Sequence, residues 1–192
     1  MVYFMSEKDG WSIMLEKVER LVSEINQIHR TYAADYFDTG KLEKVNLSRT
    51  IEKIPVEHVL DYRTYLNDSI NNYLMAASLT GMEYFYRVKT SESINNKISH
   101  YAGNAVQYPV NVWLSDIFGC RIVLDAAEIE AIEESIDDWT SLHGVKDWYK
   151  IERDGYKAFH ICFKNKNNYY FPWELQIWDA ADVENNIKAS KR

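Results

Sequence analysis

The strongest constraint in this chain is the pattern of residues 154–178, which predicts two strands joined by a tight polar turn. Residues two apart in a strand share a face, so the alternation separates an apolar face from a polar one. The turn lies around Lys164–Asn168, because Asn tolerates left-handed backbone angles. One face can therefore cover a core. The other carries Tyr156, Ala158, His160 and Cys162 on the first strand, and Glu174, Gln176 and Trp178 on the second.

The polar face of this hairpin has two explanations. Antiparallel sheets often have one solvated face, and polar residues there need no further role. The alternative is a half-enclosed site, and a second polar face further upstream in the chain favours it.

Residues 82–89 are rich in aromatic and β-branched side chains, which predicts another strand. A Thr-Ser pair follows as a helix cap, and the helix after it carries Lys97. Arg87 and Lys89 share one face of the strand, and Lys97 can reach back towards them. Cations on an edge strand discourage aggregation, which is one explanation for the group. Binding of a polyphosphate is the other.

Residues 116–125 read as a further strand with a strongly apolar centre. Asp116 opens it, and Gly119 indicates a bulge or the close approach of another group. A carboxylate at the mouth of a strand is a candidate Mg²⁺ ligand, because Mg²⁺ takes oxygen ligands and is shared with phosphates. A lone aspartate that only initiates the strand is the simpler explanation.

Four cations cluster before and into the hairpin: Lys146, Lys150, Arg153 and Lys157. Such clusters are usually solvated faces. This one adjoins Tyr156 and His160, so contact of Lys150 and Arg153 with phosphate is the functional alternative.

The order of elements predicts the fold class. Amphipathic patterns indicate helices at residues 11–30, 56–75 and 126–142. With the strands, the order is two helices, then strand, helix, strand, helix, strand, strand, which indicates an α+β domain with helices on one face of a mixed sheet. We expect an N-terminal helical region at residues 1–80, packed on a core at residues 81–192.

The sheet would gather cations, two carboxylates and an aromatic platform on one polar face. This combination suits metal-assisted transfer of a phosphate-containing group, where positioning and charge neutralisation dominate. The residues concerned are Arg87, Lys89, Asp116, Tyr156, His160, Glu174 and Gln176.

Composition bears on the partners and the cellular compartment expected for this chain. The net charge of −7 provides no global basic field for nucleic acid. The N-terminus shows no signal peptide, and no apolar stretch approaches the roughly 20 residues that span a bilayer. Cys120 and Cys162 lie in apolar strands, so we expect buried thiols in a reducing cytoplasm.

Four blocks of the sequence resemble the synthetase domain of RelA/SpoT proteins, particularly the short, single-domain small alarmone synthetases. The blocks are RVKTSES with Lys97, DIFGCRIV, GYKAFH and ELQI, and they occur in the family's order over about residues 82–178. The resemblance implies a nucleotidyltransferase-like fold. It also implies transfer of the β,γ-pyrophosphate of ATP to the 3′-hydroxyl of GDP or GTP, which makes the stringent-response alarmone (p)ppGpp.

The resemblance implies a donor side for this site. Arg87 would stack on the adenine of ATP. Lys89 and Lys97 would hold the phosphates, and Asp116 would bind Mg²⁺.

The resemblance also implies an acceptor side. Glu174 would bind metal or help to deprotonate the acceptor hydroxyl, with Gln176 beside it. Tyr156 would stack on the acceptor base, and His160 would support the phosphates or the loop.

Two positions depart from the family's pattern. The family commonly has a Pro-Lys pair and a longer loop before Gly-Tyr, whereas this chain has Lys150–Asp154, with Arg153 in place of the lysine. The family usually has Arg after the ELQI block, where this chain has Trp178. Both departures lie near positions that set donor or acceptor specificity.

Two other functions remain open. A toxin-type relative would pyrophosphorylate the 3′ end of tRNA, and it would act beside an antitoxin partner. The acidic charge disfavours a large tRNA footprint, although a local patch favours it: Lys146, Lys150, Arg153, Lys157, Lys164 and Lys166. An inactive nucleotide- or partner-binding module is disfavoured, because the expected catalytic positions are filled. A homo-oligomer is compatible with each of these functions.

Overall fold

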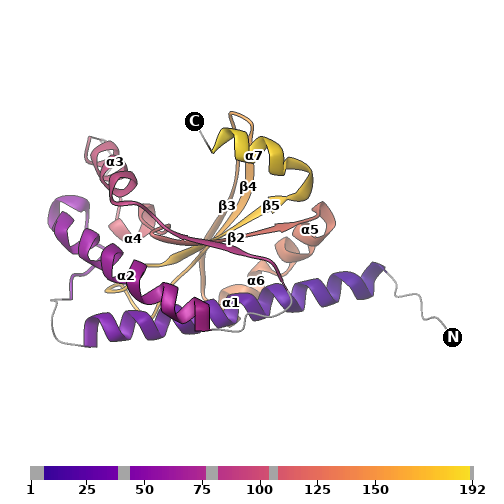
Figure 1. Ribbon diagram of the computed structural model, residues 1–192, viewed down its shortest axis with the longest axis horizontal. Helices are drawn as coiled ribbons and strands as arrows, with labels where there is room; N and C mark the ends of the chain where they lie inside the picture. The colour runs from indigo at the N-terminus through magenta and orange to yellow at the C-terminus, as the bar shows by residue number, and fades with distance from the viewer. Residues whose placement is uncertain (1–6, 39–43, 77–81, 104–107, 191–192) are drawn as a thin grey trace.

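The computed structural model describes residues 7–38, 44–76, 82–103 and 108–190 (Figure 1). Five strands and seven α-helices lie in these residues, with two short 3₁₀ helices at Ile51–Lys53 and Ala180–Asp182. The helices are α1 (Glu7–Asp38), α2 (Val56–Ala76), α3 (Ser91–Ala102), α4 (Val110–Trp113), α5 (Ala126–Glu134), α6 (Ile136–Leu142) and α7 (Val183–Ala189). The strands are β1 (Phe85–Val88), β2 (Phe118–Leu124), β3 (Val145–Arg153), β4 (Tyr156–Phe163) and β5 (Trp173–Asp179).

The strands form one sheet in the order β1-β2-β5-β4-β3. β2 and β5 run parallel, and the other neighbouring strands run antiparallel. A mixed sheet with helices before, between and after its strands confirms the predicted α+β class.

The predicted pair of strands at residues 154–178 is present as β4 and β5. His160 lies opposite Gln176, and Cys162 lies opposite Glu174, so these side chains share a face as predicted. The connection between the strands covers residues 164–172. It is therefore longer than the tight turn that the sequence suggested.

β3 is a strand that the hydrophobic pattern does not predict. It lies at the edge of the sheet, and nearly all of its residues are exposed, so its two faces do not differ in polarity. Its signal is the Asp154-Gly155 pair, whose φ angles of 54° and 81° are typical of a two-residue hairpin turn. Arg153 and Tyr156 pair directly across this turn.

The helix predicted over residues 126–142 is two helices, α5 and α6, separated at Ser135. α5 begins with a capping box, in which Asp125 and Glu128 exchange backbone-to-side-chain hydrogen bonds of 2.9 Å each. Gly144 follows α6 with a φ of 75°, which confirms it as the predicted stop. The helices predicted at residues 11–30 and 56–75 lie within α1 and α2.

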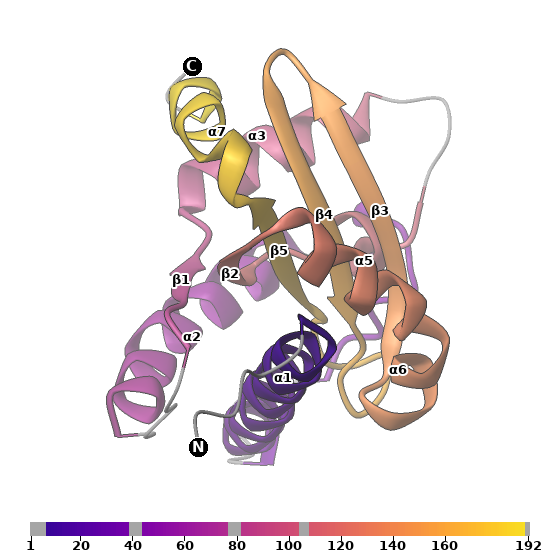
Figure 2. The same ribbon diagram turned by 90° about the vertical axis from the view of Figure 1, so that its right-hand side faces the viewer.

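The apolar face of the sheet covers the core, against α1, α2, α5 and α6 (Figures 1 and 2). α3 and α7 lie on the other side of the sheet from α1 in Figure 1, so helices lie on both sides of the sheet and not, as the sequence suggested, on one face alone. Full burial of each large apolar side chain contributes about 1.5–3 kcal/mol. Central members of the core are Val18, Val22 and Ile25 of α1 and Phe118, Ile161 and Leu175 of the sheet.

Polar groups buried in this core have partners. The Trp173 indole N–H donates to Asn26 Oδ1 at 2.8 Å, and the Asn26 amide donates to the His143 carbonyl at 2.9 Å. His29 contacts Asn165 at 2.9 Å, and burial, with a smaller effect from Arg30, lowers its pKa to about 3. His29 is therefore a neutral core histidine.

Cys120 and Cys162 are buried free thiols, as the sequence predicted. Burial raises the pKa of both to about 12, so neither is a reactive thiolate at neutral pH. Within the described residues, no helix combines the length and the apolar character that crossing a membrane requires.

Candidate active site

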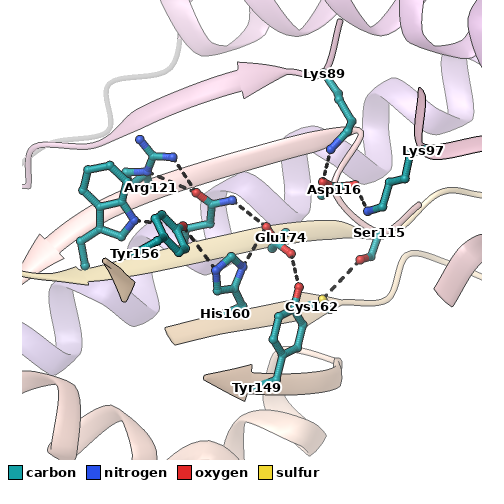
Figure 3. A network of polar contacts seen from close by, with 12 residues as sticks. Lys89, Lys97, Ser115, Asp116, Arg121, Tyr149, Tyr156, His160, Cys162 and Glu174 are labelled. Carbon is teal, nitrogen blue, oxygen red and sulfur yellow. Dashed lines mark hydrogen bonds and ion pairs between the residues drawn. The ribbon is translucent and has the colours of Figure 1, made fainter. Parts of the chain in front are cut away.

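Two buried carboxylates lie on the polar face of the sheet (Figure 3). Asp116 lies between α4 and β2, with 8% of the residue exposed. Glu174 is the second residue of β5, with 2% exposed. Buried carboxylates require compensation by charge or hydrogen bonds, so their partners define the site.

Lysines surround Asp116. Lys89, which directly follows β1, donates to Oδ2, and Lys97 of α3 donates to Oδ1 at 3.0 Å. Burial alone would raise the pKa of Asp116, but Lys97 and Lys89 outweigh it and hold the pKa below its usual value. Asp116 is therefore ionised at neutral pH. Thr90 caps α3 by accepting from the Ser93 N–H at 3.2 Å, as predicted, and this start of the helix aims Lys97 at the site.

An amide, a hydroxyl and an imidazole surround Glu174. The Gln176 amide donates to Oε1 and the Tyr149 hydroxyl to Oε2, each at 2.8 Å. His160 Nδ1 lies 3.1 Å from Oε1, although its geometry falls short of a hydrogen bond. Burial acts to raise the pKa of Glu174, but His160 and Gln176 outweigh it and lower the pKa.

A row of aromatic side chains crosses the same face. Tyr149 stacks on His160, with ring centroids 4.9 Å apart and planes 13° apart. His160 is next to Tyr156 at 6.2 Å, and Tyr156 meets Trp178 edge-on at 6.0 Å. Trp178 also donates its indole N–H to the Tyr156 hydroxyl at 3.2 Å. Trp178, which departs from the family pattern, is thus part of this row.

Arg121 completes the row, and sequence reasoning missed it. Its guanidinium lies 3.7 Å above the Trp178 ring and donates to Gln176 Oε1 at 2.8 Å. The alternation within the predicted strand 116–125 contained the signal, because it puts Arg121 on the face of Gly119. Tyr149 was also missed, because β3 was not predicted.

Arg87 reaches the polar face from β1. It pairs with Gly119, and a Cβ atom on Gly119 would lie 3.9 Å from Arg87 Cγ. The nearest atom to that Cβ position is the Glu174 carbonyl oxygen at 3.7 Å, and both distances are ordinary van der Waals contacts. The structure therefore shows neither the bulge nor the close approach predicted at Gly119. Arg87 and Arg121 both line a small cavity of about 130 Å³, which also reaches Gln176.

The other two predicted phosphate-binding cations lie elsewhere. Lys150 pairs in register with Phe159, on the apolar side of β4, and forms an ion pair with Glu133 of α5. Arg153 lies beside the hairpin turn and pairs with Asp154. Lys150 therefore lies on the opposite face of the sheet from the carboxylates, because β3 alternates its side chains between faces. Arg153 shares the polar face with Tyr149 and Tyr156, but it lies at the turn end of β3, where its ion pair is with Asp154.

The carboxylates fit a magnesium ion better than a transition metal. The described residues contain no group of three or more His, Cys, Asp or Glu side chains placed to hold a metal. Two carboxylates match Mg²⁺, which is commonly bound by one or two carboxylates together with substrate phosphates. Asp116 and Glu174 are the residues that would supply these oxygens.

Comparisons with known proteins found similarity among solved structures. No protein-family model matches the chain, and no curated protein matches it. The small alarmone synthetase 1 from Bacillus subtilis, bound to its product pppGpp, shares 21% identity over 68% of this chain and 73% of its own, with a TM-score of 0.36. The same enzyme bound to AMPCPP shares 19% identity over 70% and 72%, with a TM-score of 0.34.

A GTP pyrophosphokinase family protein from Streptococcus pneumoniae is similar at the same level. It shares 21% identity over 70% of this chain and 71% of its own, with a TM-score of 0.35. These low identities and TM-scores do not decide which substrates this chain acts on.

Proposed function

We propose that this protein transfers the β,γ-pyrophosphate of ATP to the 3′-hydroxyl of GDP or GTP. The observation that supports this most is the meeting of Asp116, its two lysines and Glu174 on one face. These residues come from three sequence blocks that resemble the RelA/SpoT synthetase domain. Ionised carboxylates beside paired cations suit phosphoryl-type transfer, which depends on positioning and charge neutralisation.

The donor side is formed by Arg87, Lys89 and Lys97. The guanidinium of Arg87, which lies over Gly119, stacks on the adenine ring. Lys89 and Lys97 now pair with Asp116, and they bind the donor's phosphates when it enters. Mg²⁺ held by Asp116 and Glu174 would neutralise the phosphate charge.

Glu174 acts as the general base. It accepts the proton of the acceptor's 3′-hydroxyl while that oxygen forms a bond to the β-phosphorus of ATP. The bond from the β-phosphorus to the oxygen bridging it to the α-phosphorus breaks, and AMP leaves with the electron pair. The lowered pKa of Glu174 keeps it deprotonated before the transfer. The resemblance puts the acceptor beside Tyr156 and His160.

A guanosine nucleotide suits the charge distribution better than tRNA. Three cations of the predicted basic patch are paired with acids, since Lys150 pairs with Glu133, Lys157 with Glu152 and Arg153 with Asp154. A tRNA footprint depends on several phosphate-neutralising cations. The remaining patch suits the phosphates of one nucleotide.

The test uses the purified protein with ATP labelled in its γ-phosphate and Mg²⁺. GDP, GTP and deacylated tRNA are supplied separately, and the products are separated by chromatography. We expect label in ppGpp from GDP and in pppGpp from GTP. Label in tRNA alone would show that tRNA, and not a guanosine nucleotide, is the acceptor. Absence of transfer to all three acceptors would contradict the proposal. The Glu174→Gln variant is the control for contaminating activity.

A further inference from the structure

A cleft of about 450 Å³ opens beside the two carboxylates, between α3, α4 and β3. Four aromatic side chains line it: Tyr101, Tyr108, Trp113 and Tyr149. Tyr101 and Trp113 stack on each other at 4.8 Å, while Tyr108 is 51% exposed. The volume is typical of a small-molecule site, and aromatic faces bind nucleobases by stacking.

The cleft reaches the proposed catalytic groups at one end. Tyr149 in its wall donates to Glu174 Oε2, and Lys97 in its wall donates to Asp116 Oδ1. A base bound by Tyr101, Tyr108 and Trp113 therefore leaves the part of the cleft at Tyr149, which contacts Glu174, for the ribose. The cavity of Arg87 and Arg121 is a separate space, which leaves the aromatic cleft for the acceptor.

A second hollow, of about 380 Å³, adjoins the aromatic cleft at Lys146. We call it the Lys-Asn hollow, because Lys146, Lys164, Lys166, Asn111, Asn165 and Asn168 line it. Among the residues that the structure describes, its three lysines have no carboxylate partner within ion-pair distance. They therefore differ from Lys150 and Lys157, which are paired with acids.

A β-bulge directs Lys146 to the junction of the two spaces. The register between β3 and β4 shifts between Val145 and Asp147, so Lys146 is the extra residue. Its ammonium donates to the Asn111 carbonyl. Bulges commonly re-aim a side chain next to an active site. Asp147 also lines the aromatic cleft, so phosphate suits the Lys-Asn side of Lys146.

Tyr156 is a less favourable stacking partner for a base. Its ring contacts both His160 and Trp178, and its hydroxyl accepts from the Trp178 indole. It lines neither the aromatic cleft nor the Lys-Asn hollow.

We propose that the aromatic cleft binds the base of the acceptor nucleotide and that the Lys-Asn hollow binds its 5′-phosphates. This inference rests on the proposed function and moves the acceptor base from Tyr156 to the cleft. Two sources supply this chemistry, a free guanosine nucleotide and the 3′-terminal nucleotide of an RNA. The experiment has an arm for each.

The experiment measures binding by isothermal titration calorimetry with guanosine, GDP and a short RNA that has a free 3′-hydroxyl. Tyr108→Ala is compared with Tyr169→Ala, a control at an exposed tyrosine outside both spaces. We expect Tyr108→Ala to weaken guanosine and GDP about 5- to 10-fold, at the lower end of base stacking. Val112→Asp, at the 43% exposed rim, tests the cleft independently of Tyr108.

The phosphate contacts are tested with the double variant Lys164→Ala/Lys166→Ala. We expect weaker binding of GDP, by about 5-fold, with guanosine unchanged, since only GDP carries phosphates. Lys150→Ala/Lys157→Ala removes the same charge from paired lysines and is the matched control. Stronger binding of the RNA than of GDP, with the same loss in Tyr108→Ala, supports the cleft and identifies the RNA source.

Two outcomes overturn the inference and can be told apart. If Tyr108→Ala and Val112→Asp keep wild-type affinity for GDP while Tyr156→Ala loses it, the base lies on Tyr156 and the proposed function stands. If the wild-type protein binds none of the three ligands, the proposed function fails together with the cleft.

Discussion

Asp116 and Glu174 are both buried carboxylates on one sheet face, but their surroundings keep them ionised in different ways. Two ammonium groups hold Asp116, whereas a hydroxyl, an amide and an imidazole surround Glu174. The ammonium groups around Asp116 can turn to incoming phosphates, while the Tyr149 hydroxyl and the Gln176 amide each hold one oxygen of Glu174. Under the proposed function, Asp116 would exchange its lysine partners with incoming phosphates, and Glu174 would act as the base.

The largest expected effect is on Glu174. We expect Glu174→Gln to lower kcat by about 10²–10⁴-fold, because the general base is lost. The near-isosteric amide keeps the volume, so the far-UV circular dichroism spectrum should be unchanged. Steady-state kinetics in saturating Mg²⁺ is the measurement. Turnover within tenfold of wild type would show that another group takes the proton.

The lysines around Asp116 should differ in their effect on stability. Lys89 is 10% exposed in its side chain and Lys97 is 27% exposed, so Lys89→Met should destabilise more. We expect about 3 kcal/mol for Lys89→Met and about 1 kcal/mol for Lys97→Met in urea unfolding at pH 7.

The pH dependence of this loss has a definite sign. The folded-state pKa of Asp116 is lowered, so its contribution is present above the unfolded pKa of about 3.9 and is lost as pH falls through the folded value. The deficit of either variant should therefore be largest near neutral pH and shrink in acid. A deficit that does not depend on pH would mean that packing, not charge, is responsible.

A variant at Tyr149 tests how the groups around Glu174 set its pKa. Tyr149→Phe removes a hydroxyl that donates to the carboxylate, so the pKa of Glu174 should rise. A hydrogen bond to a charged group contributes about 1.5–3 kcal/mol, which corresponds to about one pH unit or more. The acid limb of the kcat profile should move to higher pH by that amount, because Glu174 acts deprotonated. Tyr169→Phe is the control, and an unmoved limb would assign Tyr149 a packing role.

The smallest expected effect is at Lys150. Its ion pair with Glu133 is solvent-exposed, with 59% of the lysine side chain accessible, and such pairs contribute about 0–1 kcal/mol. We expect Lys150→Ala to keep kcat and the KM for ATP within about twofold of wild type, since Lys150 lies away from the carboxylates. A tenfold rise in KM for ATP would restore the phosphate role suggested by the sequence.

Much of the site could be predicted because its strands carry a strong pattern. β4 and β5 alternate polar and apolar residues, and this period places His160, Glu174 and Gln176 on one face. Strand character at Arg87 and Gly119 was also predicted, while the register of β1 against β2 is what pairs the two residues. The roles of these residues as substrate ligands stay predictions.

Other parts of the site could not be predicted from residue pattern. β3 is an exposed edge strand that is held by pairing with β4, so its hydrophobicity does not alternate. Because β3 was not predicted, Tyr149 was not placed in the site. Lys150 was expected beside the face of Tyr156 and His160, whereas it lies on the opposite, apolar face. The Asp154-Gly155 turn was the one local signal, and both residues have the positive φ that it requires.

Apart from β3, the short helix α4 and the separation of α5 from α6, the sequence by itself determined the order of helices and strands. It also determined the two faces of β4 and β5, and which carboxylates and cations were available. These depend on local periodicity and on turn chemistry, which short segments carry independently of the rest of the chain. Only the tertiary structure decided which cation meets which carboxylate. Lys89 and Lys97 reach Asp116 because β1 pairs with β2 and α3 begins shortly after β1, while Lys150 turns to Glu133 on α5. Such pairings join residues far apart in sequence, and sheet order and strand register set them, so no local pattern contains them.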